Sequence, residues 1–214
     1  MSKKIYKYCC DKTYQSQIFN LIQTYHYSHL VPSIRAIRKA SGLLTEETTL
    51  VAGILWSIPA SSWKEPVLEL SRLVRLPDTR PPLTKLISQS VKEIIKEKQY
   101  NLLISYADAT HDHHGGVYQA ASWKYSGVRK GRLDAFLIDG VRVPCRTCNH
   151  RYGTSSIKLI EILGKKGHKV IPCISKDKHL YWRALSKEGI AKAERLGLKD
   201  LPYPKPNSSA KTQE

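Results

Sequence analysis

The sequence predicts an α/β (α+β) fold, in which a central mixed and mostly antiparallel sheet is flanked by helices. Apolar residues recur at helical spacing in residues 14–25 and 83–95, which indicates two amphipathic helices. Apolar runs of strand length lie at residues 48–57 and 102–104. The second run ends in a polar, glycine-containing stretch, residues 105–127, that feeds a helical pattern. Open α/β sheets bind ligands at such junctions, so we expect the working site there.

The N-terminal part predicts a helix followed by a hairpin. His26-Tyr27-Ser28-His29 closes the helix at 14–25, and Pro32 prevents its continuation. Residues 34–40 are ambiguous, but the Ser41-Gly42 pair and the polar loop after it make them look like one arm of a hairpin. The other arm is the strand 48–57, which we expect to be buried on both faces.

Residues 68–76 alternate like a strand, with one unusual member. Arg72 falls on the same face as Leu68, Leu70, Val74 and Leu76. A buried guanidinium needs a partner. The sequence leaves two possibilities open, an ion pair with Glu65 or Asp108, or a bound anion.

The next helix, 83–95, follows Asp78-Thr-Arg-Pro-Pro82, and its N-terminus lies close to two cations. Proline is tolerated at the first turn because the N–H that it lacks has no intrahelical partner. Arg75 and Arg80 flank this terminus, which makes it a candidate phosphate cradle.

The C-terminal half predicts one more helix, then strands and short helices. In the helix expected from Gly116, Tyr118, Ser122 and Tyr125 share one face, where they either line a pocket or form an amphipathic rim. We expect a hairpin at 133–143, a helix at 155–163, a hairpin of 170–174 with 179–185, and a helix at 186–196. Nothing resembles a linker, so residues 1–200 are expected to form a single domain, and the Pro- and Lys-rich residues 201–214 a disordered tail.

The charge of the chain indicates a polyanionic partner. The 214 residues carry 35 Lys and Arg against 18 Asp and Glu, a net charge of +17 that is spread along the chain. Such a domain usually binds nucleic acid, because cations that neutralise phosphates release counterions. Arg129, Lys130, Arg132 and Arg151, together with neighbouring aromatic residues, are the candidate DNA-binding set.

The sequence gives no sign of export or of a membrane. The N-terminal cations are not followed by an apolar segment, and the longest apolar run, 50–56, is too short to span a bilayer. Five cysteines, an odd number, fit a reducing compartment, so a cytoplasmic location is expected. The oligomeric state cannot be read from the sequence.

Two groups of side chains could bind a metal. Asp108, His111, Asp112, His113 and His114 could hold a divalent ion or act as general acids or bases, but could equally form a solvated loop. The Cys145 and Cys148 pair, with histidines downstream, invites a structural zinc site, although a second closely spaced pair is lacking.

Several motifs together resemble the phage Mom family of DNA-modifying proteins. Tyr106-Ala-Asp-Ala-Thr-His111 precedes Tyr118-Gln-Ala and Trp123, and both follow His26-Tyr27-Ser28 and Glu69-Leu-Ser-Arg72-Leu-Val. The later Asn149-His-Arg-Tyr-Gly-Thr154 segment also fits, so the resemblance covers about residues 26–185.

The resemblance implies a GNAT-type acyltransferase fold and a catalytic domain that modifies DNA. The implied reaction adds a carbamoylmethyl (methylcarbamoyl) group to the exocyclic amine of adenine, in duplex DNA or at a locally unpaired base, and protects phage DNA from restriction. His26, Tyr27, Asp108 and Tyr118 would form the catalytic set and would also hold iron. Arg72, with Arg75 and Arg80, would lie on the donor side of the site.

One departure bears on the group donor. GNAT enzymes bind the pyrophosphate of acetyl-coenzyme A on a glycine-rich loop, whereas this chain has Arg80-Pro81-Pro82, which removes two backbone donors. This argues against acetyl-coenzyme A and leaves the donor unidentified. Two other functions stay open, an N-acetyltransferase acting on a small amine or a protein, and a metal-dependent DNA-binding protein or nuclease.

Overall fold

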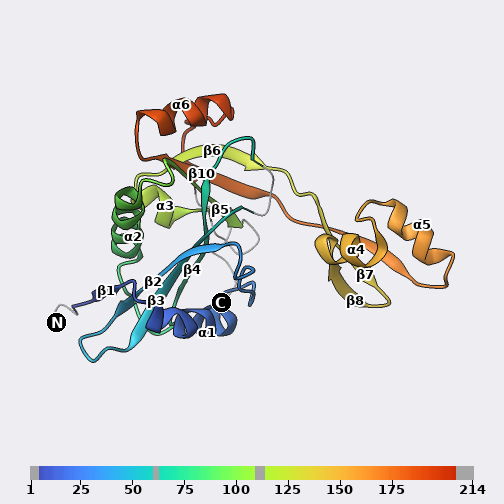
Figure 1. Ribbon diagram of the computed structural model, residues 1–214, viewed down its shortest axis with the longest axis horizontal. Helices are drawn as coiled ribbons and strands as arrows, with labels where there is room; N and C mark the ends of the chain where they lie inside the picture. The colour runs from blue at the N-terminus through green and yellow to red at the C-terminus, as the bar shows by residue number, and fades with distance from the viewer. Residues whose placement is uncertain (1–4, 60–62, 109–113, 206–214) are drawn as a thin grey trace.

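The computed structural model describes residues 5–59, 63–108 and 114–205, and its main body is built on one seven-stranded sheet (Figure 1). The strand order is β1-β2-β3-β4-β5-β10-β6. Neighbouring strands run antiparallel except for β4 and β5, which are parallel. The predicted mixed, mostly antiparallel sheet flanked by helices is therefore confirmed.

The elements of the main body have the following bounds. The strands are β1 (Lys7–Cys9), β2 (Ile37–Leu44), β3 (Leu50–Ser57), β4 (Leu68–Arg75), β5 (Leu102–Asp108), β6 (Lys124–Arg129) and β10 (Lys178–Ala184). The helices are the short 3-10 helix η1 (Lys12–Tyr14), α1 (Gln15–Tyr25), α2 (Leu83–Glu97), α3 (Gly116–Ala120) and α6 (Lys187–Arg195). None of the helices in the described residues is long and apolar enough to cross a membrane.

Helices cover both faces of the sheet. Leu103 of β5 packs in the same core cluster as the buried residues of α2, whereas its neighbour Ile104 packs with Ala193 of α6. Leu55 of β3 packs with Ile18 of α1, on the same side as α6. Because successive strand residues point to opposite faces, α1 and α6 cover one face and α2 with α3 cover the other. All eight residues of β3 are buried, as predicted for the strand at 48–57.

The parallel strands β4 and β5 separate in the middle of the sheet. They pair only over three residues each, from Leu68 and Leu103 to Leu70 and Ser105, although both strands continue further. At this last rung, Ser105 Oγ donates a hydrogen bond of 2.8 Å to the Leu70 carbonyl. Beyond it β4 and β5 no longer pair with each other, so the sheet is open between these two central strands.

A β-bulge lies at the same place and changes the predicted orientation of Arg72. Leu55 of β3 pairs with Arg72 while the next residue, Trp56, pairs with Leu70, so Ser71 is the extra residue. An extra residue shifts the alternation beyond it. Leu68 and Leu70 therefore face α2, whereas Val74 packs with α1. The predicted common face of Arg72 with Leu68 and Leu70 is wrong, because the sequence pattern did not reveal the bulge.

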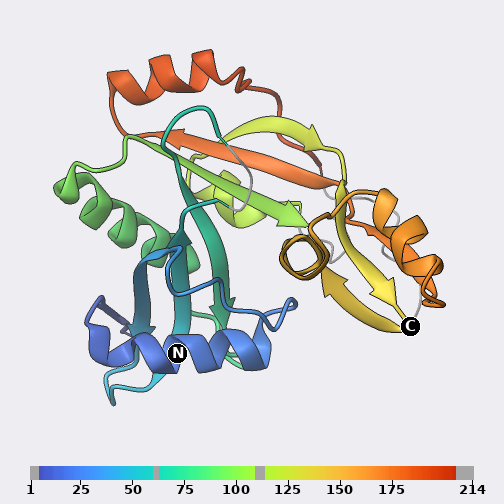
Figure 2. The same cartoon turned by 45° about the vertical axis from the view of Figure 1, so that its right-hand side comes forward.

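A second, smaller sheet projects from the main body as a lobe (Figures 1 and 2). Its strand order is β8-β7-β9, and its elements are β7 (Leu133–Ile138), β8 (Val141–Pro144), α4 (Cys145–Tyr152), α5 (Lys158–Gly164) and β9 (Val170–Ile174). Phe136 and Leu159 belong to a hydrophobic cluster of its own. The predicted hairpin at 133–143 is present, with Asp139 and Gly140 both at positive φ, as its tight turn requires.

Two other expectations differ from the structure. Residues 170–174 and 179–185 do not form a hairpin, because β9 pairs with β7 in the lobe while β10 pairs with β5 and β6. The helix from Gly116 ends at Ala120, since Ser122 has a φ of 60°, and Tyr125 lies on a strand instead. The expectation of one domain over residues 1–200 stays a prediction.

The segment after residue 200 is packed against the body where the structure describes it. The Leu201 N–H donates to the Tyr125 carbonyl at 2.9 Å, and the Tyr203 hydroxyl donates to the Trp123 carbonyl at 2.8 Å. The expected disorder thus does not hold for residues 201–205, and residues 206–214 lie outside the described part.

Candidate active site

The end of α1 brings His26 and Tyr27 to the opening between β4 and β5. His26 is the C-terminal cap of α1 and is only 7% exposed, while Tyr27 is 40% exposed. The Ser28 N–H donates to His26 Nδ1 at 3.2 Å, and Ser28 Oγ lies 2.9 Å from the same nitrogen. The rings of His26 and Tyr27 lie against each other, with their centroids 4.3 Å apart. The chain after α1 thus folds back into a turn that fixes the imidazole.

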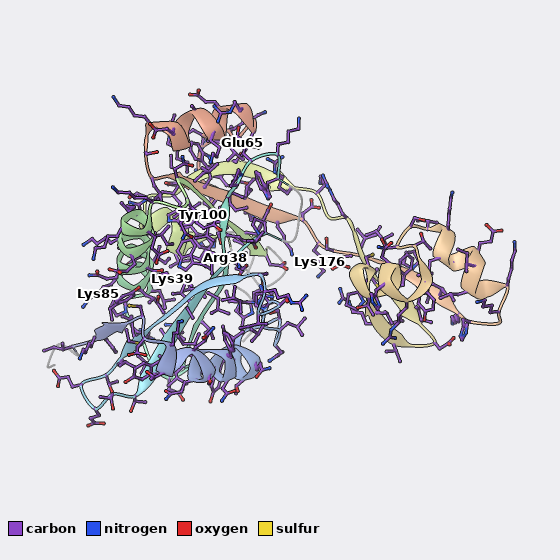
Figure 3. The ribbon with its side chains drawn as sticks, in the orientation of Figure 1. Arg38, Lys39, Glu65, Lys85, Tyr100 and Lys176 are labelled. Atoms are coloured by element: carbon purple, nitrogen blue, oxygen red, sulfur yellow. The ribbon has the colours of Figure 1, made fainter. Side chains whose placement is uncertain are left out.

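Arg72 fastens this turn to the sheet. Its Nε donates to the Leu30 carbonyl at 2.7 Å and its Nη1 donates to the Ser71 carbonyl at 2.6 Å. Arg72 therefore does not form the predicted ion pair with Glu65. Glu65 (Figure 3) instead accepts two hydrogen bonds from Arg195 of α6. Arg72 therefore holds the segment that carries Tyr27 against β4.

Glu69 lies on β4 at the same opening, and the sequence reasoning did not single it out as a site residue. It is partly buried on the face covered by α1 and α6, together with Ile104 of the neighbouring strand. Burial raises the pKa of Glu69 from 4.5 to about 7, even though the charges of Arg72 and Lys178 act in the opposite direction. Close to neutral pH this carboxyl can therefore take up or release a proton.

Asp108 ends β5 on the face that also carries Glu69. It lies opposite Lys178 of β10 in the antiparallel ladder, and Lys178 in turn lies opposite Arg129 of β6. Asp108 is also close to Tyr27, since partial burial and then the Asp108 charge raise the pKa of the Tyr27 phenol. The sheet thus places the predicted aspartate beside the turn that follows α1.

Tyr118 reaches the opening from the opposite face. It is 8% exposed and packs against Trp123 and Tyr181, with ring centroids 5.6 and 5.3 Å away. Burial raises its pKa to about 12, although a hydrogen bond to Ser105 acts against the shift. The charges of Tyr27 and Glu69 would also disfavour its ionised form, which shows that the three side chains are neighbours. Tyr118 is therefore a neutral hydrogen-bond donor at neutral pH.

A hydrogen-bond network fixes the helix that carries Tyr118. The Tyr181 hydroxyl donates to the His114 carbonyl at 2.6 Å, and Gln119 Nε2 donates to the same carbonyl and to the Tyr181 oxygen. Gly115, at a φ of 81°, lies so close that an added Cβ would be 2.2 Å from the Tyr181 ring. The start of α3 is thus held against β10.

These side chains together form a candidate site for proton transfer. One carboxyl with a pKa near neutrality, two neutral phenols and a fixed imidazole surround the edges of two separated strands. Such a set can bind an amine, accept its proton and donate hydrogen bonds to a polarised group.

Comparisons with known proteins identify the family of this chain. The model of the Mom protein family matches residues 8–205. This chain belongs to the Mom protein family. A search of curated proteins found no match.

Solved structures similar to this Mom protein have the GNAT acetyltransferase fold. A putative acetyltransferase from Acinetobacter baylyi has a TM-score of 0.52 at 12% identity, over 86% of this chain and 94% of that one. An acetyltransferase from Bacillus subtilis, solved in complex with coenzyme A, has a TM-score of 0.50 at 6% identity, over 86% of this chain and 100% of that one. The predicted GNAT-type fold is confirmed.

The four residues expected to hold iron carry suitable side chains, but two of them, His26 and Tyr118, form other hydrogen bonds in this Mom protein. Imidazole, carboxylate and phenolate are suitable ligands. However, the Ser28 N–H occupies the lone pair of His26 Nδ1, so the neutral ring carries its hydrogen on Nε2. The Tyr118 hydroxyl is hydrogen-bonded to Ser105, and its pKa of about 12 disfavours the phenolate form. The iron assignment stays a prediction, and no step below uses a metal.

The other predicted metal groups are also not assembled in the described part of the chain. There, no three His, Cys, Asp or Glu side chains gather closely enough to hold an ion. Cys145 and Cys148 lie in α4, where burial raises the pKa of both thiols. Of the histidine run, His114 lies at the start of α3, while His111, Asp112 and His113 lie outside the described residues.

The cations predicted to bind a donor or DNA fall into three places. Arg75 and Arg80 are exposed between β4 and α2, and Arg75 Nη1 donates to the Thr79 carbonyl at 3.3 Å. The N-terminal cap of α2 is Pro82, so the structure keeps the predicted proline start. Arg129, Lys130 and Arg132 lie where the lobe joins the body. Arg151 lies on α4 in the lobe.

Glu69 could have been found from one signal in the sequence. It belongs to the Glu69-Leu-Ser-Arg72 motif. When a helix covers each face of a sheet, the side chains on both faces of a central strand such as this one are buried. The alternation of residues 68–76 indicated one apolar face, and Glu69 does not belong to that face.

Proposed function

We propose that this Mom protein transfers a carbamoylmethyl group to the exocyclic amine of adenine in DNA, and thereby protects that DNA from restriction. One observation carries the proposal: a carboxyl with a pKa of about 7 lies beside two neutral tyrosines where β4 and β5 separate. An amine that enters this opening meets a base and hydrogen-bond donors together.

Glu69 is the proposed general base. In the reaction the amine nitrogen attacks the methylene carbon of an activated carbamoylmethyl donor, a new N–C bond forms, and the leaving group departs with the bonding electron pair. The amine proton passes to the Glu69 carboxylate. Tyr27 donates a hydrogen bond to a group that gains negative charge, and Arg72 keeps Tyr27 in place. Tyr118 is hydrogen-bonded to Ser105 and lines the site.

DNA as the acceptor is supported by family membership and by charge. The net charge of +17 suits a phosphate backbone, and adenine presents an exocyclic amine once it leaves the base stack. A flipped base needs an apolar and aromatic surround, to which Tyr27, 40% exposed, contributes beside the opening.

An N-acetyltransferase is the second candidate, because the similar solved structures include acetyltransferases. Pro81 and Pro82 disfavour it, since they take two N–H donors from the start of α2, where a pyrophosphate would be bound. Isothermal titration with acetyl-coenzyme A separates the two candidates, and tight binding without DNA affinity would favour the acetyltransferase.

Nucleoside mass spectrometry tests the proposal. DNA from cells that express the wild-type chain should yield deoxyadenosine that carries one carbamoylmethyl group, and DNA from cells expressing Glu69→Gln should yield far less of it. Plasmid from the wild-type cells should also resist restriction enzymes whose sites contain adenine. Unmodified adenine throughout, with soluble folded protein in the cells, would refute the proposed function.

A further inference from the structure

The projecting lobe carries more than its share of the positive charge. Residues 130–177, which include the lobe and its two connections to the body, contain ten Lys and Arg against four Asp and Glu. This is a net charge of +6 within less than a quarter of the chain. The functional site of the main body does not use this surface.

Every acidic residue of this segment is already paired. Asp134 pairs with Arg142, Asp139 with His168, Glu161 with Lys165 and Asp177 with Lys130, at 2.6 to 2.9 Å. Six exposed cations remain, and within the described residues none has a carboxylate within 4.0 Å: Arg132, Arg151, Lys158, Lys166, Lys169 and Lys176. A surface with an excess of solvated cations that lack carboxylate partners is suited to bind a phosphate backbone, which neutralises them.

Two short connections, residues 130–132 and 175–177, form a neck between the lobe and the body. The Ser175 N–H donates to the Arg132 carbonyl at 2.8 Å, and the Gly131 N–H donates to Asp177 Oδ1 at 2.9 Å. An added Cβ on Gly131 would lie 1.6 Å from the Ser175 carbonyl oxygen, so the two backbones are in direct contact. Figure 3 shows Lys176 in this neck. The lobe is therefore attached by two bonded strands of backbone and not by one loose linker.

The neck begins at the candidate active site. Lys178, the residue after the neck, lies on β10, opposite Asp108 of β5 on one side and opposite Arg129 of β6 on the other. A long polyanion bound along the lobe and the neck would therefore pass the opening between β4 and β5. This position distinguishes the lobe from basic surfaces elsewhere on the body.

We propose that the lobe is a DNA-holding arm, which binds the backbone of duplex DNA through its exposed cations and presents the adjoining base pairs to the site. The inference rests on the proposed function and adds the surface that positions its substrate. Arg151, Lys158 and Lys166 on and beside α4 and α5 contact phosphates. Lys130, which the sequence also predicts to bind DNA, forms an ion pair with Asp177 across the neck.

The test compares two variants of equal charge. The lobe variant carries Arg151→Glu, Lys158→Glu and Lys166→Glu, and the control carries Lys12→Glu, Lys92→Glu and Lys187→Glu, three exposed cations on η1, α2 and α6. Anisotropy of a fluorescein-labelled duplex of about 20 base pairs is followed from about 50 to 200 mM NaCl. The lobe variant should bind about tenfold or more weakly, and the slope of log affinity against log salt should fall by roughly 2.7. The control should stay close to wild type.

The outcomes separate this inference from the proposed function. Equal losses in both variants, wild-type binding by the lobe variant, or stronger lobe-dependent binding of an RNA duplex would overturn the arm. The adenine modification is read independently by mass spectrometry. Modified adenine at the wild-type level in cells expressing the lobe variant would refute the arm, whereas lobe-dependent DNA binding without any modification in wild-type cells would refute only the proposed reaction.

Discussion

At the scale of single residues, the property that matters most is the proton affinity of Glu69. Its carboxylate lies close enough to Arg72 and Lys178 to be stabilised, yet the pKa is raised, because the loss of water outweighs both charges. Two of the five N–H donors of Arg72 bond to the carbonyls of Leu30 and Ser71, which fixes the guanidinium in place. Arg72 therefore positions the segment that carries Tyr27, while the pKa of Glu69 stays near 7.

Replacement of this base should abolish most of the transfer. We expect Glu69→Gln to lower the rate of adenine modification by about 10²- to 10⁴-fold, the usual contribution of a general base. In the wild type the rate should rise with pH and level off above a pKa of about 7, as the carboxylate forms. The variant should lose this rise. A wild-type pH profile that is unchanged in Glu69→Gln would contradict the assignment, and Glu65→Gln, on the α6 side, is the control.

The same raised pKa makes stability depend on pH. Folded Glu69 keeps a proton up to about pH 7, whereas in the unfolded chain it releases the proton near 4.5. The contribution of this group to the free energy of unfolding is therefore present at low pH and is lost as the pH rises through this window. Urea unfolding at about pH 5 and pH 8 should show Glu69→Gln gaining stability relative to wild type at the higher pH. An equal difference at both pH values would show that Glu69 is ionised throughout.

The sequence revealed only part of the site at this scale. The motifs with His26-Tyr27 and Asp108 pointed to residues that the structure places around one opening. Glu69 was missed because its neighbours alternate like a strand with one solvated face, and a strand in the middle of a sheet does not have one. Local alternation indicates which residues share a face only where no bulge interrupts the strand, and only the topology shows what covers that face.

At the scale of elements, the sequence predicted most helices and strands but not all of their partners. Val170–Ile174 and Lys178–Ala184 are both strands, as expected, yet they belong to different sheets. The reason lies in the neck, where residues 175–177 form hydrogen bonds with residues 130–132 and do not turn back as a hairpin. Strand pairing is a long-range property, so periodicity cannot supply it.

The neck itself can be tested with one methyl group. We expect Gly131→Ala to push the two connections apart, because the new Cβ would meet the backbone of Ser175. Trypsin should then cleave faster at Arg129, Lys130 or Arg132, and duplex affinity should fall. Gly164→Ala is the matched control, since an added Cβ at the end of α5 meets nothing within 4 Å. Equal cleavage rates for the two variants would show that the neck does not hold the lobe.

At the scale of the whole molecule, the chain has hydrophobic cores of very different size. Three clusters of buried residues line the two faces of the large sheet, while the lobe has a separate cluster built around Phe136, Leu159 and Leu163. No buried residue of the lobe cluster belongs to a cluster of the body. A unit of about this size holds roughly 2–7 kcal/mol of stability. The lobe should therefore unfold on its own, at a lower free energy than the body.

Truncation in the small core should unfold the lobe and leave the body folded. Phe136 is fully buried, and its replacement by Ala should cost about 3–5 kcal/mol, which is comparable with the stability of the whole lobe. Hydrogen exchange should then be fast in β7 and β9 but unchanged in β3 and β4. The affinity for duplex DNA should also fall, because an unfolded lobe presents its cations on a chain that must first be ordered. Slow exchange in β7, or loss of protection throughout β3, would show instead that body and lobe fold as one unit, in which case the arm and the site could not be separated by mutation.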